Sequence, residues 1–198
     1  MSTVTQRRYT PEEYLALERT AEYKNEYVNG RIYAMTGASR EHNLIAGNVF
    51  GELRTRLRGR ACEVYMGDMR VRVSPTGLYT YPDVVALCGE PRFEDSHVDT
   101  LLNPTVIVEV LSPSTEAYDR GEKFAHYRRL ETLSEYVLVA QDKMRVEHYR
   151  RDGEHWVLTE ISDPEGVLSL LAVGCEIPLP EICERVEFDG SDRDVGQA

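Results

Sequence analysis

The 198-residue sequence has little cysteine, and its cysteines form no metal-binding or redox pattern. Cys62, Cys88, Cys175 and Cys183 are scattered along the chain without any C-x-x-C pair. This spacing excludes a zinc ribbon and a thioredoxin-like redox motif. We therefore expect all four to be reduced side chains that pack in the interior, as is usual in a cytosolic protein.

Long apolar runs are also missing. No segment approaches the roughly 20 apolar residues that a membrane-spanning helix needs, and residues 1–8 are not followed by the apolar core of a signal peptide. The sequence contains no internal repeat, low-complexity tract or interdomain linker. We expect a cytoplasmic protein without membrane association, folded as one domain over residues 1–186 with a flexible tail over residues 187–198.

Positive charge is scarce, because 23 basic and 34 acidic residues give a net charge of -11. Such a chain repels a polyanion unless its basic residues gather locally. Basic residues cluster in two segments, although an ordinary solvated surface is the simpler explanation of each cluster. The first segment contains Arg54, Arg56, Arg58 and Arg60, and the second contains Arg145, His148, Arg150 and Arg151.

The N-terminal half alternates helix and strand signals. Thr10-Pro11-Glu12-Glu13 is a capping box, which predicts a helix from Pro11 to about Arg19. Asn29-Gly30 predicts a tight hairpin between strands at 26–28 and 31–35. A long helix is predicted after Ser39, with an inward stripe that begins at His42 and continues through Ile45, Val49, Leu53 and Leu57. Further strands are expected at 62–65 and 69–73, then, after a turn at 75–77, near Tyr79 and Asp83.

The C-terminal half predicts a βαβ unit followed by a hairpin. The strand 106–111 leads into a helix over about 119–130 and a strand at 136–140, which places the first strand inside a sheet covered by helices. Asp152-Gly153 separates the strands 145–150 and 155–161 of the hairpin. The segment 89–103 is predicted to be a polar loop.

Glu109 lies inside the most apolar stretch of the chain, Val106–Leu111. An unpaired buried carboxylate is costly, so Glu109 needs a cation, a hydrogen-bond network or a metal ion, unless its strand lies at an exposed sheet edge. Asp83 opens a second apolar run after Pro82, where it could instead cap a turn. Two carboxylates supply the oxygen ligands that Mg²⁺ or Mn²⁺ prefers, and a metal so held activates water and polarises phosphate.

Lys123 follows on the predicted helix, in line with Asp119 and Tyr127. It would stabilise negative charge on a phosphate, and an exposed pair with Asp119 is the alternative. His42 would touch a phosphate or a metal-bound water, although a histidine satisfied by a neighbour is the commoner case. Tyr127 would bond a carboxylate or simply pack, and Ser112 and Ser114 would bind phosphate or shape a turn.

Pro82-Asp83, Glu109-Val110-Leu111-Ser112-Pro113-Ser114, Asp119 and Lys123 together resemble the Uma-two family of predicted endonucleases. The resemblance extends from Tyr9 through Glu26-Tyr27-Val28-Asn29-Gly30 and His42 to about Ile161. This family belongs to the PD-(D/E)XK, restriction-endonuclease-like superfamily. The resemblance implies an α/β fold in which helices flank a mixed central sheet, with additional β-hairpins and with Asp83 and Glu109 on adjoining strands.

The superfamily pattern places a lysine two residues after the acidic residue, where this chain has Leu111. The resemblance implies that the lysine has moved to the following helix as Lys123, with Arg120 as its competitor.

The function that the resemblance implies is metal-dependent hydrolysis of nucleic acid, with DNA as the expected partner and a homodimer as the expected assembly. Asp83, Glu109, Lys123 and His42 are the predicted catalytic residues, and Asp83 and Glu109 are the predicted ligands of Mg²⁺ or Mn²⁺. An inactive nucleic-acid or protein-binding module and a hydrolase of small phosphorylated molecules remain alternatives. A positive channel around the carboxylates would support polymer cleavage, and a negative rim would count against it.

Overall fold

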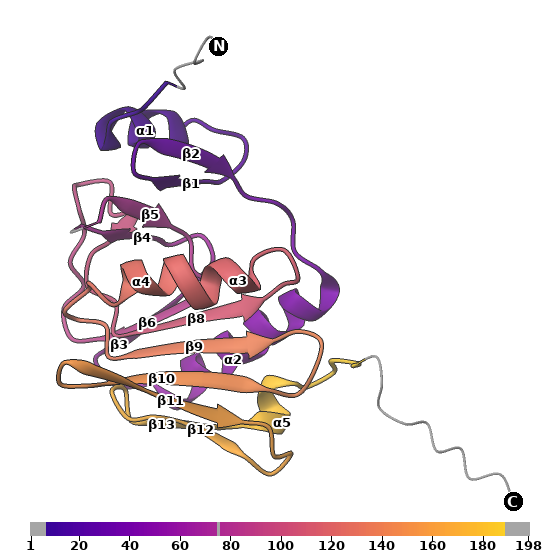
Figure 1. Ribbon diagram of the computed structural model, residues 1–198. Helices are drawn as coiled ribbons and strands as arrows, with labels where there is room; N and C mark the ends of the chain where they lie inside the picture. The colour runs from indigo at the N-terminus through magenta and orange to yellow at the C-terminus, as the bar shows by residue number, and fades with distance from the viewer. Residues whose placement is uncertain (1–6, 75, 189–198) are drawn as a thin grey trace, which may run out of the picture.

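A computed structural model describes residues 7–74 and 76–188 of the chain (Figure 1). The helical elements are α1 (Pro11–Glu18), α2 (Arg40–Arg56), α3 (Glu116–Tyr118), the π-helical turn η1 (Asp119–Lys123), α4 (Phe124–Tyr127) and α5 (Leu179–Ile182). The strands are β1 (Asn25–Val28), β2 (Arg31–Ala34), β3 (Cys62–Met66), β4 (Arg70–Val73), β5 (Leu78–Thr80), β6 (Val84–Cys88), β7 (Thr100–Leu101), β8 (Val106–Leu111), β9 (Glu135–Ala140), β10 (Val146–Asp152), β11 (His155–Ile161), β12 (Val167–Leu170) and β13 (Cys175–Pro178).

The centre of the fold is a six-stranded mixed sheet with the order β11-β10-β9-β8-β6-β3. Strands β8 and β9 are parallel, and the other neighbours in this sheet are antiparallel. The helical segment α3-η1-α4 connects the two parallel strands. The predicted mixed central sheet, the βαβ unit and the β10–β11 hairpin are therefore confirmed.

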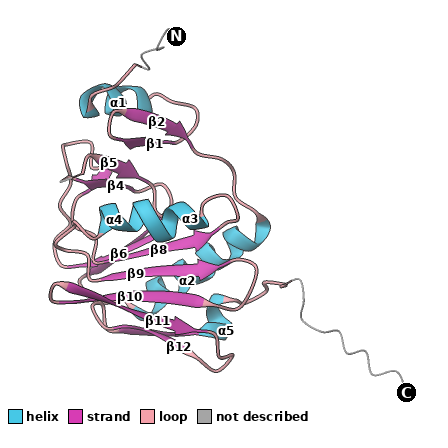
Figure 2. Ribbon diagram, viewed as in Figure 1, coloured by secondary structure: helices cyan, strands magenta, loops and turns pink. Residues whose placement is uncertain are grey.

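Helices cover both faces of this sheet (Figure 2). Successive side chains of a strand point to opposite faces, and the residues of β8 follow this rule. Val106, Val108 and Val110 pack in one cluster with the buried face of α2. Ile107 and Leu111 pack in another cluster with Phe124 and Tyr127. The continuous apolar run of β8 thus reflects burial on two sides.

A second sheet, with the order β2-β1-β5-β4-β7, stands above α4 in Figure 1. It contains the predicted N-terminal hairpin, in which Asn25 to Val28 pair with Arg31 to Ala34. The prediction that residues 89–103 form only a polar loop is wrong, because β7 pairs in parallel with β4. A strand of two residues is too short to show a pattern in the sequence.

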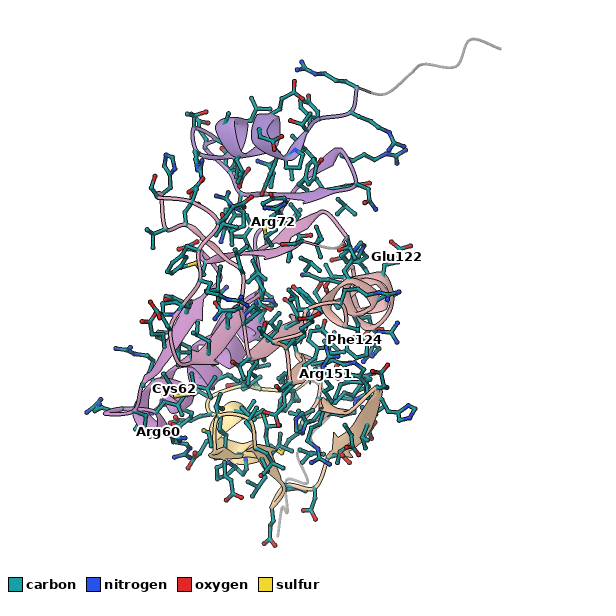
Figure 3. The ribbon with its side chains drawn as sticks, turned by 90° about the vertical axis from the view of Figure 1, so that its left-hand side faces the viewer. Arg60, Cys62, Arg72, Glu122, Phe124 and Arg151 are labelled. Carbon is teal, nitrogen blue, oxygen red and sulfur yellow. A yellow bond between two sulfur atoms is a disulfide. The ribbon has the colours of Figure 1, made fainter. Side chains whose placement is uncertain are left out.

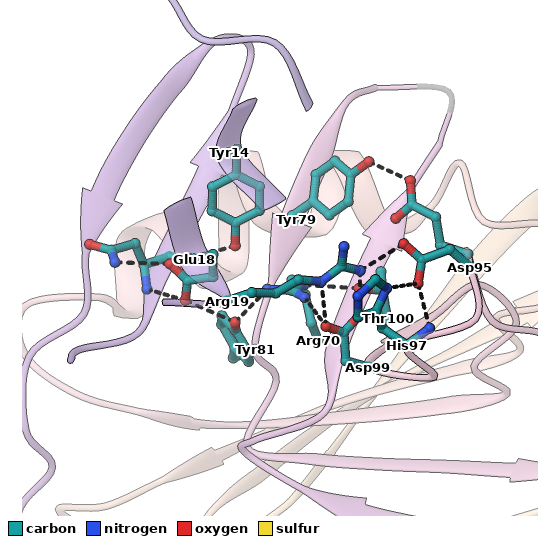
Figure 4. Close-up of polar contacts among 12 residues, drawn as sticks. Tyr14, Glu18, Arg19, Arg70, Tyr79, Tyr81, Asp95, His97, Asp99 and Thr100 are labelled. Atoms are coloured by element: carbon teal, nitrogen blue, oxygen red, sulfur yellow. Dashed lines mark hydrogen bonds and ion pairs between the residues drawn. The ribbon is translucent and has the colours of Figure 1, made fainter. Parts of the chain in front are cut away.

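A buried arginine explains why the loop before β7 is held in place (Figure 4). Arg70 donates to Thr100 and Tyr81, each over 2.9 Å, and lies 2.9 Å from a carboxylate oxygen of Asp99. Arg19, at the end of α1, reaches the same carboxylate over 2.8 Å. This network joins the N-terminal segment to the second sheet and to the 95–100 loop.

The helix after β8 differs from the predicted span of 119–130. Helical structure begins at Glu116 and ends at Tyr127, and its middle is the π-helical turn η1. A π-turn contains an extra residue, so it interrupts the spacing from which an α-helix is predicted. Asp119, Lys123 and Tyr127, which the sequence placed on one line, are all buried in this segment.

The prediction of four reduced cysteines is wrong for one pair. Cys62 and Cys88 are directly opposite each other in the β3–β6 register, with Cα atoms 4.0 Å apart, and form a disulfide. Cys175 and Cys183 are free and buried, as predicted. The antiparallel pairing brings the first two sulfur atoms together, and the linear sequence contains no signal of that pairing.

Two remaining expectations concern the chain ends and membranes. Of the predicted tail, residues 189–198 lie outside the described part of the chain, and Phe188 packs against the core. None of the helices in the described ranges is both long and apolar enough to cross a membrane.

The capping box of α1 allows a stability prediction. Thr10 Oγ1 accepts from the Glu13 N–H over 3.2 Å, and the Glu13 carboxylate accepts from the Thr10 N–H over 2.9 Å. Thr10→Ala removes the first bond, so we expect the free energy of unfolding to fall by about 1 kcal/mol. Urea denaturation measures this change, with Thr36→Ala, at an exposed position outside the helices and strands, as the control. An unchanged midpoint would show that the cap does not stabilise α1.

Candidate active site

The two carboxylates predicted to bind metal meet on neighbouring strands. β6 and β8 pair with Val84 opposite Val108. Asp83 precedes Val84 by one residue and therefore comes opposite Glu109. The Val110 N–H donates to Asp83 Oδ2 over 2.7 Å, and the Asp83 N–H donates to Glu109 Oε2 over 3.4 Å. The predicted placement of Asp83 and Glu109 on adjoining strands is thus confirmed.

Glu109 is buried on the face of the sheet that packs against α4. Its neighbours two positions away, Ile107 and Leu111, belong to the apolar cluster on that face. Glu109 itself is only 4% exposed. Its Oε1 accepts from the Tyr127 hydroxyl over 2.8 Å and lies 2.9 Å from Lys123 Nζ. The carboxylate therefore has the cation and the hydrogen bond that its burial requires.

The π-helical turn η1 directs Asp119 and Lys123 toward the sheet. Both side chains are buried, and Lys123 Nζ lies 3.6 Å from Asp119 Oδ1. Turns of this kind are frequent at functional sites. The alternative of an exposed Asp119–Lys123 pair is excluded, because neither side chain faces solvent.

Glu26 of β1 also reaches Lys123, and the sequence reasoning missed it. Its Oε1 lies 3.4 Å from Lys123 Nζ and accepts from the Thr80 hydroxyl. A single acid in a short hairpin strand looks like an ordinary solvent-facing residue. The available signal was its position at the head of Glu26-Tyr27-Val28-Asn29-Gly30, one of the stretches that carries the family resemblance.

His42 joins the site from the first turn of α2. Ser39 caps this helix by accepting from the His42 N–H over 3.1 Å. The ring Nε2 lies 3.2 Å from Asp83 Oδ2. Burial alone would lower the pKa of His42, but the hydrogen bond and charge of Asp83, together with Asp119, outweigh it and raise that pKa. His42 thus contacts one predicted metal ligand directly.

Excess negative charge is the main electrostatic feature of the site. Burial raises the pKa of Glu109 to about 8, and the charges of Asp83 and Asp119 add to this rise while Lys123 opposes it. Burial alone would lower the pKa of Lys123, but three surrounding carboxylates keep it well above its usual value. Lys123 is therefore a stable ammonium, and an additional cation would stabilise the neighbouring carboxylates.

These residues line a cleft of about 870 Å³ between the N-terminal hairpin, the start of α2 and the end of β8. Its described lining contains six carboxylates and two lysines: Glu22, Glu26, Asp68, Asp83, Glu109, Asp119, Lys24 and Lys123. Both lysines are paired, since Lys24 lies 2.9 Å from Asp68 and Lys123 lies 2.9 Å from Glu109. The cleft is consequently acidic rather than the positive channel that would support binding of a polyanion by charge.

Other candidates from the sequence do not reach the carboxylates. Arg120, the competitor of Lys123, makes a bidentate contact with Glu147 and lies 3.0 Å from Glu116. The hydroxyl oxygens of Ser112 and Ser114 are 3.0 Å apart, and both residues are at the cleft lining. They contact each other, which agrees with the turn-forming alternative.

The two basic clusters lie away from the site. Arg54, Arg58 and Arg60 line a separate hollow of about 260 Å³ at the far end of α2. A helix of 17 residues is about 25 Å long, which separates this hollow from His42; Figure 3 shows Arg60 beside Cys62 at that end. In the second cluster, Arg151 donates to backbone carbonyls of the segment that follows α4.

The donor set fits a hard divalent cation. Asp83 and Glu109 supply carboxylate oxygens, and in the described ranges no group of three or more histidine, cysteine or acidic side chains is placed so that it could hold a metal ion. Mg²⁺ is typically held by one or two carboxylates, with waters and substrate phosphates completing its shell. Asp83 and Glu109, two carboxylates of adjoining chain segments in an acidic cleft, are the donor type that this mode of binding uses.

Comparisons with known proteins identify the family and the fold of the chain. Residues 11–180 match the Uma2 family, which is described as "Putative restriction endonuclease". Two uncharacterized proteins of Synechocystis are similar to the chain: one is 38% identical over 81% of this chain and 92% of its own length, the other 35% identical over 90% and 93%. A crystal structure from Anabaena variabilis, described as a "putative nuclease", has a TM-score of 0.72 at 16% identity and covers 88% of this chain and 97% of its own. At that identity, the likeness shows a shared fold.

Proposed function

Because this chain belongs to the Uma2 family, we propose that it is an endonuclease that uses Mg²⁺ or Mn²⁺ to hydrolyse phosphodiester bonds of nucleic acid, with DNA as the expected substrate. The observation that carries the proposal is the meeting of Asp83 and Glu109 beside Lys123 in one cleft. A homodimer remains the expected assembly, since two-fold dimers are the commonest oligomers.

Asp83 and Glu109 would hold the ion. When bound, the ion supplies Lewis-acid polarisation of a phosphate and a more acidic water. The charge of Asp83 adds to the effect of burial in raising the pKa of Glu109, so a bound cation would relieve the repulsion between the two carboxylates. The Val110 N–H orients Asp83, and the Tyr127 hydroxyl orients Glu109.

Lys123 provides the positive charge that a phosphate meets at this site. Its ammonium is held by Glu109, Asp119 and Glu26, so it needs little reorganisation when negative charge develops on the substrate. This arrangement supports the proposal that Lys123 has the role that a strand lysine has in the superfamily pattern. Leu111, at the usual lysine position, instead packs in the core.

A cleavage screen tests the proposal. Single-stranded, double-stranded and branched DNA and RNA are incubated with the full chain in Mg²⁺, in Mn²⁺ and in a chelator, and the products are resolved by denaturing electrophoresis. We expect endonucleolytic products only with the divalent ion. The proposal fails if no nucleic acid is cut at any ion concentration, or if cutting persists unchanged in Asp83→Asn.

His42 is expected to act by positioning Asp83. His42→Phe removes the 3.2 Å contact to Asp83 Oδ2, and loss of a residue that supports a metal ligand typically weakens metal affinity about 10- to 100-fold. Calorimetric titration with Mn²⁺ measures this change, and Leu44→Ala, in the same helix but outside the cleft lining, is the control. Equal Mn²⁺ affinity of His42→Phe and wild type would limit His42 to packing.

The acidic lining favours one second candidate, a hydrolase of small phosphorylated molecules. A small substrate needs few backbone contacts, so the absence of unpaired lysine among the described lining residues would not hinder it. Release of inorganic phosphate from a panel of nucleotides and sugar phosphates, assayed beside the nucleic-acid screen, separates the two candidates.

A further inference from the structure

Exposed tyrosines stand at the rim of the cleft. Tyr23 is 74% exposed and Tyr33 is 49% exposed, and both line the cleft. Large aromatic side chains usually bury most of their surface, so two of them at one acidic cleft require an explanation. Tyr23 lies in the loop between α1 and β1, and Tyr33 lies in β2.

The hairpin register places Tyr33 beside the reactive groups. Tyr33 is directly opposite Glu26 in the β1–β2 pair, and residues directly opposite in an antiparallel pair have side chains on the same face. Glu26 in turn contacts Lys123. The ring of Tyr33 therefore flanks the position where a phosphate would approach Lys123.

The loop that carries Tyr23 is anchored by its neighbour. Lys24 Nζ donates to the Gly67 carbonyl and lies 2.9 Å from Asp68 Oδ1, which ties the loop to the turn between β3 and β4. The Met35 N–H donates to the Lys24 carbonyl over 2.9 Å and extends the hairpin ladder to this point. Tyr23 and Tyr33 are thus presented from a fixed hairpin.

The acidic lining of the cleft bears on which form of nucleic acid the two tyrosine rings would bind. Duplex DNA is held mainly through lysine and arginine contacts to its phosphates, and the described lining has only two lysines, both paired with carboxylates. Binding must therefore draw on contacts other than charge. Bases of a duplex are already stacked on one another, whereas unpaired bases can stack on aromatic side chains.

We propose that the cleft selects unpaired nucleotides, whose bases stack on Tyr23 and Tyr33 while the adjacent phosphate faces Lys123. This inference rests on the proposed endonuclease function and names its substrate class: single strands, or unpaired segments within a duplex. Selectivity arises because a paired duplex can use neither the tyrosine rings nor a positive groove in this cleft.

Binding of 2-aminopurine oligonucleotides tests the inference. The full chain is titrated in Ca²⁺, which limits cleavage, against a labelled single strand and against the same strand in a duplex. We expect quenching of the 2-aminopurine fluorescence by stacking, and an affinity for the single strand at least about tenfold above that for the duplex. Tyr23→Ala and Tyr33→Ala should each weaken single-strand binding about tenfold, the loss expected for one stacked base.

Matched variants separate stacking from folding. Tyr23→Phe and Tyr33→Phe keep the ring and should bind within about twofold of wild type. Leu171 is 62% exposed and is not part of the cleft lining, so Leu171→Ala should bind like wild type. The inference is overturned if the duplex binds as tightly as the single strand, if the alanine variants bind like wild type, or if no oligonucleotide binds.

The cleavage screen distinguishes this inference from the function on which it rests. Cleavage of duplex by wild type and by both alanine variants alike would overturn the inference and leave the endonuclease proposal standing. If single strands stack on the tyrosines but are not cleaved in Mg²⁺ or Mn²⁺, the endonuclease proposal fails and the selectivity for unpaired nucleotides stands.

Discussion

Glu109→Gln is expected to reduce metal-dependent cleavage on the order of 10³-fold, the upper end of the effect of removing one preorganised electrostatic group. The amide keeps the shape of the side chain and an oxygen that can accept from Tyr127, but it has no charge for a divalent ion. Lys123 retains Asp119 and Glu26 as partners. Initial rates of oligonucleotide cleavage at saturating Mn²⁺ measure the loss.

The control for this variant is Glu147→Gln. Glu147 is also a buried strand carboxylate paired with a basic residue of the helical segment, but it is not part of the cleft lining. We expect its cleavage rate to stay within a few-fold of wild type. Similar losses in both variants would mean that the effect arises from general loss of structure.

Lys123→Met is expected to reduce cleavage roughly 10²-fold, because the thioether keeps the length of the side chain but removes its charge. An exposed pair with Asp119, the alternative that the sequence left open, would let the fold tolerate loss of this lysine. The structure changes that expectation, since Lys123 is buried among three carboxylates. Removing one partner of a buried ion pair costs roughly 3–5 kcal/mol, so the metal-free variant should unfold at lower denaturant concentration.

Arg120→Met is the matched control for Lys123→Met, because Arg120 lies in the same π-helical turn but contacts Glu147. Its cleavage rate should remain close to that of wild type. Mn²⁺ should also restore part of the stability of Lys123→Met, since a ligand that binds only the folded state stabilises it. If Arg120→Met loses activity and Lys123→Met does not, the lysine assignment is wrong.

Local patterns were sufficient for much of the fold. The capping box at Thr10, the Asn29-Gly30 turn and the inward stripe of α2 each depend on residues a few positions apart. Glu109 could also be recognised from its neighbours in sequence, because an acid within a fully buried strand needs a partner wherever the strand lies. The sequence could therefore identify the carboxylate, although it could not identify every group around it.

The tertiary structure alone decided which distant residues share the site. Glu26 reaches Lys123 because the second sheet stands over the helical segment, and Cys62 meets Cys88 because of one strand register. Pairing and register depend on the summed packing of whole elements, which leaves no short-range signal at any single residue. The sequence by itself showed that positive charge is scarce. Which carboxylates pair with the two lysines of the described cleft lining depends on the folded arrangement, so only the structure showed that both lysines are paired.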